Sequence, residues 1–135
     1  MSMAFARSSY RQAETYGAQE VEDPHQIISV TLRELERSLG VMKAAQDVDR
    51  KYPEEHMNRA FTAIYILQTS LDFEKGGEIA TSLFQVYEFC RLQIVKAFRR
   101  EENPQIAEAL EAIGGILSAW REIGAQVKSG DISNS

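Results

Sequence analysis

Apolar residues recur along most of this chain at alternating steps of three and four, the spacing that places side chains on one face of an α-helix. Four segments show this pattern, from about residue 24 to 48, 54 to 71, 78 to 100 and 104 to 127. Each is therefore predicted to be a helix with one inward stripe. The stripes are Ile28, Leu32, Leu35, Leu39 and Met42; Met57, Ala60, Ile64, Leu67 and Leu71; Ala80, Leu83, Tyr87, Cys90, Ile94 and Ala97; and Ile106, Leu110, Ile113, Leu117 and Trp120.

Residues that favour helix ends stand at the borders of these segments. Asp23 and Asn103 each precede a proline, an order typical of an N-cap followed by the first helical turn. Gly76 and Gly77 lie between the second and third segments, where their backbone freedom is expected to let the chain reverse. The sequence thus predicts four helices joined by short turns.

The second and third helices carry more apolar residues than one inward stripe needs. Phe61, Tyr65 and Ile66 widen the stripe of the second helix. In the third, further apolar residues spread around most of the circumference: Ile79, Phe84, Val86, Phe89, Leu92, Val95 and Phe98. A helix that is apolar on nearly every side is either central in its bundle or keeps one face for a partner.

Four stripes of similar length joined by short turns predict an all-α fold, an antiparallel up-down four-helix bundle over residues 24–127. Residues 1–23 are expected to form a short helical flap and a linker, because the weakly amphipathic N-terminal stretch is too short to hold a helix alone in water. The polar residues 128–135 are expected to be a disordered tail.

Composition excludes several classes of function. The chain has 20 acidic and 15 basic residues, and no Lys/Arg cluster beyond Arg99-Arg100, which argues against nucleic-acid binding. Cys90 is the only cysteine, and there is neither a signal-peptide pattern nor an apolar stretch long enough to insert into a membrane. A cytoplasmic protein is expected.

The residues that carry chemistry do not form a catalytic or metal-binding pattern. One Glu-x-x-His spacing exists, from Glu22 to His25, but Pro24 lies within it at a helix start, so no metal site is expected. His25 and His56 are expected to be exposed to solvent, and Cys90 to be a buried, unreactive thiol. We expect no cofactor, because Lys75-Gly76-Gly77 matches neither common nucleotide-binding glycine motif.

The residues alone therefore predict a non-enzymatic interaction module. Its surplus apolar face suits an amphipathic segment of another protein. Two alternatives remain: a phosphotransfer or signalling bundle that uses His25 or His56, and a structural bundle whose surplus face pairs with a second copy.

Several motifs stand in a fixed order between Tyr10 and Trp120. The longest is Leu71-Asp72-x-Glu74-Lys75-Gly76-Gly77-Glu78-Ile79-Ala80-x-x-Leu83; the others are Pro24-His25-Gln26-Ile27-Ile28, Val86-Tyr87-Glu88-Phe89, Asn103-Pro104 and Ala119-Trp120. Together they resemble the pattern of the flagellar secretion chaperone family FliS over most of the chain. One departure is Thr31-Leu32-Arg33-Glu34, where the family usually has an aromatic residue followed by Asp-Gly.

The resemblance implies a cytoplasmic chaperone that binds the disordered C-terminal region of flagellin, prevents premature polymerisation and assists delivery to the flagellar type III export gate. It also implies that the N-terminal segment with Tyr10 can cover an apolar groove that the client later occupies. A monomer or weak homodimer is expected. The expected partner-binding residues are Tyr10, Ile27, Phe61, Tyr65, Leu71, Phe73, Ile79, Leu83, Phe84 and Tyr87.

Overall fold

Within residues 23–129, four helices follow one another in the order that the hydrophobic pattern predicts. The computed structural model describes residues 23–129, with side chains up to residue 124. The helices are α2 (Pro24–Asp47), α3 (Glu54–Thr69), α4 (Phe73–Phe98) and α5 (Ile106–Ser129). The flap expected at residues 1–23 lies outside this range apart from Asp23, and so does the expected tail, apart from the two residues by which α5 extends past residue 127.

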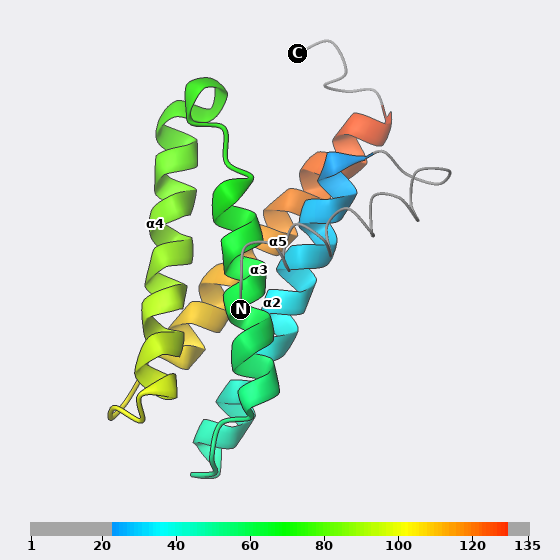
Figure 1. Cartoon of the computed structure of the whole chain (residues 1–135). Coiled ribbons are helices and arrows are strands. Elements are labelled where there is room, and N and C mark those ends of the chain that lie inside the picture. Colours follow the sequence, from blue (N-terminus) through cyan, green and yellow to red (C-terminus); the bar gives the residue numbers. More distant parts are fainter. Residues whose placement is uncertain (1–22, 130–135) are drawn as a thin grey trace.

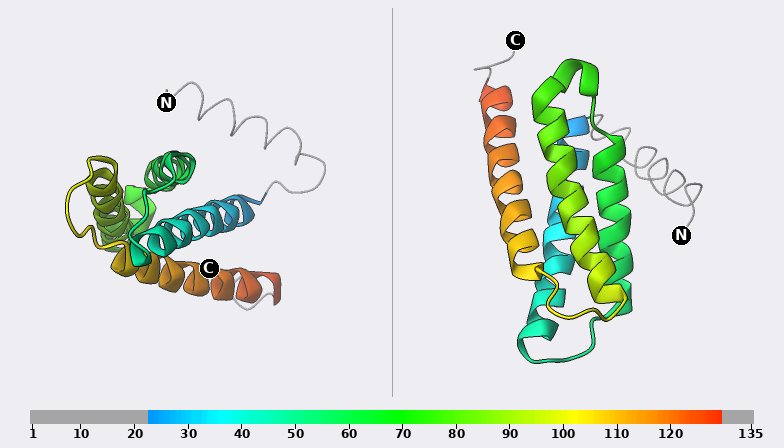
Figure 2. Two further views of the ribbon diagram at one scale, coloured as in Figure 1. Left: turned by 90° about the horizontal axis from the view of Figure 1, so that it is seen from below. Right: turned by 90° about the vertical axis from the view of Figure 1, so that its left-hand side faces the viewer.

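The helices alternate in direction and form a ring (Figure 1). Packing joins α2 to α3, α3 to α4, α4 to α5 and α5 back to α2. The predicted antiparallel up-down four-helix bundle is therefore confirmed. The ring is not uniform, because α5 diverges from α4 toward the end of the bundle where α4 begins (Figures 1 and 2).

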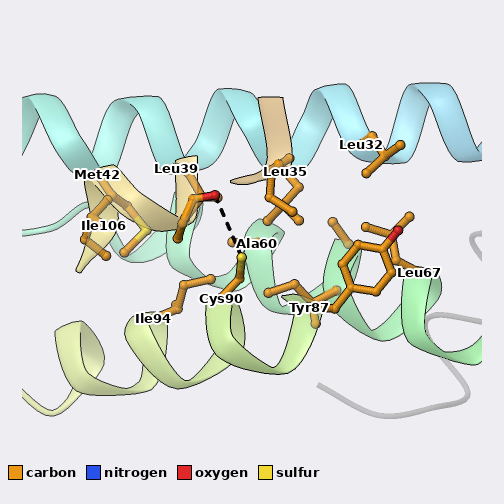
Figure 3. Close-up of a cluster of buried hydrophobic side chains, with 14 of the residues drawn as sticks. Leu32, Leu35, Leu39, Met42, Ala60, Leu67, Tyr87, Cys90, Ile94 and Ile106 are labelled. Atoms are coloured by element: carbon orange, nitrogen blue, oxygen red, sulfur yellow. Dashed lines mark hydrogen bonds between the residues drawn. The ribbon is translucent and has the colours of Figure 1, made fainter. Parts of the chain in front are cut away.

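The core consists of the predicted stripes. Most of their members are buried in one cluster, and Ala80 is buried outside it. The others pack against the cluster half-buried: Ile28, Leu71, Leu83, Leu110 and Trp120. Figure 3 shows how side chains from all four helices meet there. Cys90 is buried, and its thiol lies 3.8 Å from the Ala109 carbonyl oxygen of α5, to which it donates a weak hydrogen bond. Burial raises the pKa of the Cys90 thiol to about 12, as expected for an unreactive structural cysteine.

The N-terminus of α2 is capped by Asp23, as predicted. The Asp23 carboxylate accepts a hydrogen bond from the His25 backbone N–H, with 3.0 Å between Oδ1 and N. His25 in turn stacks on Trp120 of α5, with 4.6 Å between the ring centroids. Its Nε2 lies 2.6 Å from the Trp120 carbonyl oxygen, and Trp120 Nε1 donates to the His25 carbonyl oxygen at 2.9 Å. These reciprocal contacts hold the start of α2 against α5.

Both α2 and α4 end in the same hydrogen-bonded motif without a glycine. Asp49 after α2 and Arg100 after α4 have positive φ, of 55° and 59°. In each case the next residue's N–H donates to a carbonyl five residues back, from Arg50 to Ala45 and from Glu101 to Lys96. This is the Schellman motif, which uses carbonyls that would otherwise be unpaired at a helix end.

The start of α5 differs from the prediction. Asn103 does not cap the helix, because it has a left-handed backbone (φ 52°) and α5 begins only at Ile106. Instead, the buried Gln93 of α4 accepts a hydrogen bond from the Gln105 N–H at 2.8 Å. Gln46 of α2 donates to the Pro104 carbonyl oxygen at 2.9 Å. Side chains of two other helices therefore fix this turn, which the local sequence could not reveal.

The chain reversal between α3 and α4 also lies elsewhere than predicted. It occurs at Ser70–Asp72, before the two glycines, and Asp72 caps α4 by accepting a hydrogen bond from the Lys75 N–H at 3.0 Å. Gly77 instead kinks α4 four residues after it begins, with φ 51° and ψ −124°. A residue with a Cβ is strained there, and a Cβ on Gly76 would approach the Ala80 Cβ to 2.9 Å.

Replacing Gly77 by alanine tests this strain. We expect Gly77→Ala to lower the free energy of unfolding by about 1–2 kcal/mol, because alanine disfavours this backbone conformation. Gly115→Ala is the matched control, since Gly115 lies within α5 and a Cβ there would meet no atom within 4 Å. It should raise the unfolding free energy by about 0.5–1 kcal/mol. Urea denaturation measures both unfolding free energies. If the two variants change them in the same direction, the backbone of Gly77 is not strained for residues with a Cβ.

Candidate functional site

The largest group of exposed apolar side chains lies on α4. Eight large apolar side chains are exposed in the described part of the chain, and five of them belong to this helix: Phe73, Ile79, Phe84, Leu92 and Phe98. Their exposed fractions run from 38% for Phe84 to 72% for Ile79. Of the surplus predicted for this helix, Ile79, Phe84, Leu92 and Phe98 are therefore exposed, whereas Val86, Phe89 and Val95 are half-buried.

The kink at Gly77 gathers two of these side chains. In a straight helix, Phe73 and Phe84 would be separated by about 16 Å along the axis, at 1.5 Å per residue. Their ring centroids are in fact 6.1 Å apart, with the rings tilted by 60°. The first turn of α4 is folded back, as Figure 1 shows at the top of the helix, and this makes the contact possible. An open pocket of about 510 Å³ adjoins it, lined by Phe73, Gly77, Glu78, Thr81 and Ser82.

Residues of α3 extend the apolar surface beside α4. Phe61, Tyr65 and Gln68 recur at steps of four and three, so they share one side of α3. Gln68 contacts Glu88 of α4, which shows that this side borders α4. Phe61 and Tyr65 are half-buried. We call the surface formed by these residues and the outward residues of α4 the α3–α4 face: Phe61, Tyr65, Gln68, Phe84, Glu88, Arg91, Val95 and Phe98.

A hydrogen-bonded cluster lies within this face, and we call Gln68, Glu88 and Arg91 the polar triad. Gln68 Nε2 donates to Glu88 Oε1 at 3.1 Å, and Arg91 Nε donates to the same oxygen at 2.9 Å. Arg91 Nη2 donates to Glu88 Oε2. The hydrogen bond from Arg91, followed by that from Gln68, lowers the pKa of Glu88 to about 2.

The predicted partner-binding residues divide into exposed, half-buried and buried groups. Phe73, Ile79 and Phe84 are exposed on α4. Half-buried residues are Phe61 and Tyr65 on α3, Leu71 in the connection, Leu83 on α4 and Ile27 on α2. Tyr87 is not at the surface, because only 3% of it is exposed within the core, and burial raises its pKa to about 12. Tyr10 lies outside the described residues.

Both histidines differ from the prediction that they are exposed to solvent. His25 is half-buried against Trp120 and Gly124, where an added Cβ would come within 2.3 Å of the His25 ring. His56 is also half-buried, and its Nδ1 lies 3.3 Å from the hydroxyl of the buried Ser38. The prediction was wrong because the contacts come from other helices. Within residues 23–129, no cluster of three or more His, Cys, Asp or Glu residues could hold a metal ion.

A second hollow lies at the opposite end of the bundle from the kink. It has a volume of about 960 Å³ and is lined by the turns after α2 and α4 and by nearby helix ends. Met57 and Ala97 contribute apolar surface, and exposed Phe98 connects it with the α3–α4 face. Acidic and basic residues are mixed around it: Asp49, Arg50, Lys51, Glu54, Arg100, Glu101 and Glu102. The mixture gives no clear preference for an ion of either sign.

Comparison with known proteins places the chain in a family. The model of the family described as flagellar protein FliS matches residues 6–127. The chain belongs to the FliS family. A relative from Vibrio cholerae named flagellar secretion chaperone FliS is 28% identical over 116 residues, 85% of each chain. One of the same name from Campylobacter jejuni is 31% identical over 108 residues, which are 76% of this chain and 81% of the relative.

No solved structure matches the chain at a significant level. FliS membership confirms the resemblance found in the motifs, and it supports a role as a flagellar secretion chaperone. Among the described residues, no helix is both long and apolar enough to span a membrane.

Sequence reasoning did not find the polar triad. The spacing of Glu88 and Arg91, three residues apart on a helix, is typical of an ion pair, and it was the one available signal. Gln68 could not be added to the pair, because its position depends on how α3 and α4 align. That alignment is a property of the folded bundle.

Glu88 makes the stability of the protein depend on pH. A carboxyl group whose pKa is lowered on folding stabilises the folded state above its unfolded pKa, here about 4.5, and loses this contribution as the pH falls toward 2. Because the pair is partly exposed, we expect a loss of only about 1 kcal/mol between about pH 5.5 and pH 3. The free energy of unfolding of Glu88→Gln, measured by urea denaturation, should therefore fall less over this pH range than that of the wild type. Glu111→Gln, at an exposed position of α5, is the control and should follow the wild-type curve.

Proposed function

We propose that this FliS-family chain is a cytoplasmic chaperone that binds the disordered C-terminal region of flagellin. Binding would prevent premature polymerisation and assist delivery to the flagellar type III export apparatus. The observation that carries the proposal is the α3–α4 face, where the exposed Phe84 and Phe98 of α4 lie beside the half-buried Phe61 and Tyr65 of α3. A client segment that forms an amphipathic helix can lay its apolar side on this face.

The free energies of apolar burial and of client ordering indicate how much of the face the client must cover. Complete burial of a large apolar side chain contributes about 1.5–3 kcal/mol, so each half-exposed side chain of α4 contributes about 1 kcal/mol. Ordering a disordered segment costs about 2–5 kcal/mol. Phe84 and Phe98, the exposed apolar residues of α4 on this face, therefore contribute together only about 2 kcal/mol, the lower end of that cost. Net affinity requires further contacts, for which Phe61 and Tyr65 are placed.

No observation favours the phosphotransfer alternative. The Nε2 atom of His25 is engaged by the Trp120 carbonyl oxygen, and its ring is covered by stacking. The Nδ1 atom of His56 faces the buried Ser38 hydroxyl. Among residues 23–129, the hydrogen-bond partners of the two rings are a carbonyl oxygen and a hydroxyl, and not a carboxylate.

A charge placed on the α3–α4 face should prevent client binding. We expect Phe84→Asp to weaken binding of a flagellin C-terminal peptide at least tenfold in titration calorimetry, because the client would bury a carboxylate. Gln85→Asp is the matched control, because Gln85 is the next residue along α4, is exposed, and lies on another side of the helix. It should leave the affinity within about twofold.

Equal affinities for these two variants would contradict the proposal that α4 binds the client. Light scattering on the same samples tests the alternative in which the apolar face joins two copies. In that case Phe84→Asp would turn a dimer into a monomer in the absence of peptide.

Removal of residues 1–17 tests the covering role that the family resemblance gives to the segment with Tyr10. If that segment covers the face in about nine-tenths of the molecules, its removal should tighten peptide binding about tenfold. Titration calorimetry of the truncated chain measures the change. Tyr10→Ala should reproduce part of it, and an unchanged affinity in both variants would exclude competition between the segment and the client.

A further inference from the structure

The polar triad divides an otherwise apolar stripe on α4. Phe84, Glu88, Arg91, Val95 and Phe98 follow one another at steps of four, three, four and three, so they lie in one row along the helix. All five are at least partly exposed. The row covers about 21 Å at 1.5 Å per residue, and its two charged members stand between apolar ends.

The neighbouring side of α3 continues this order on one side of the triad, toward Phe98. Gln68 of α3 contacts Glu88 of the antiparallel α4, so these two residues are at the same level. Phe61 comes seven residues before Gln68, and Val95 comes seven residues after Glu88. Phe61 is therefore level with Val95. The α3–α4 face thus has an apolar end near the Phe73–Phe84 contact, a polar middle at the triad, and a second apolar end at Phe61 and Val95.

A helix bound along this row would cover the triad. Glu88 and Arg91 still expose 32% and 41% of their side chains, and a bound helix would remove water from them. The Glu88 carboxylate already accepts three hydrogen bonds, whereas the Arg91 bonds use only two of its five N–H groups. The remaining donors need an acceptor from the ligand, because a polar group buried without a partner weakens binding.

We propose that the triad fixes the register of the bound client helix. The client must then carry a side chain with a hydrogen-bond acceptor, such as an amide or carboxylate oxygen, level with Arg91 and between two apolar segments. The same physical effect operates in coiled coils, where a single polar residue in the seam selects one alignment. This inference rests on the proposed function, because it takes the flagellin C-terminal segment as the occupant of the face.

The test combines changes in the peptide with changes in the chain. Each polar residue of a flagellin C-terminal peptide is replaced in turn by leucine, and the affinity for the wild-type chain is measured by calorimetry. We expect one replacement, or two on the same side of the peptide helix, to weaken binding about tenfold. The Glu88→Leu/Arg91→Leu chain should bind the same replaced peptide at least as tightly as the original peptide, because the polar group it faced is gone.

Two further chains make the outcome decisive. Gln85→Leu/Lys96→Leu adds two leucines to exposed positions of α4 outside the row, and should keep the wild-type preference. Glu88→Gln/Arg91→Met, which also leaves no charge in the row, repeats the measurement in case Glu88→Leu/Arg91→Leu folds poorly. If all peptide replacements weaken binding to the wild-type chain equally, the register role is overturned. The same holds if the variants of the triad still prefer the original peptide to the replaced one. Either result leaves the proposed function standing. A wild-type chain that binds no flagellin peptide would overturn this inference together with the proposed function.

Discussion

The structure depends on four helices that must bury their apolar stripes against one another. A helix in a four-membered ring can hide only the part of its circumference that faces the centre and its two neighbours. The stripes of α2, α3 and α5 largely fit this limit, whereas α4 carries apolar residues well beyond it. Divergence of α5 from the beginning of α4 increases the excess there (Figure 2). The exposed apolar series on α4 therefore follows from the geometry of the bundle.

Periodicity was sufficient to predict the helices and the core, because the burial of a stripe depends on spacing within one helix. Two of the predictions that failed concerned contacts between helices. Gln93 of α4, rather than Asn103, bonds to the start of α5, and His25 lies against Trp120. The two glycines were correctly identified as special but assigned the wrong task. The backbone of Gly77 kinks α4, whereas the chain reverses at the three residues before that helix.

The candidate site was predictable in its apolar part and not in its polar part. An excess of apolar residues in one helix is visible in the sequence, and it pointed to Ile79 and Phe84, which are exposed. Tyr87, also expected to bind the partner, lies on the inward stripe that the sequence predicts, and it is buried. The triad depends on the alignment of two helices, and no spacing within either helix encodes that alignment.

Under the proposed function, the order of apolar and polar groups on the α3–α4 face would suit a client that is later released. Apolar contacts supply most of the affinity, and they discriminate poorly between amphipathic helices. Hydrogen bonds to a desolvated polar cluster add less net affinity, because they replace bonds to water, but an unmatched ligand leaves the cluster without partners. Dividing the apolar stripe by Gln68, Glu88 and Arg91 would therefore limit the strength of binding to the proposed client while it increases selectivity. An uninterrupted stripe of the same length would bind more tightly and less specifically.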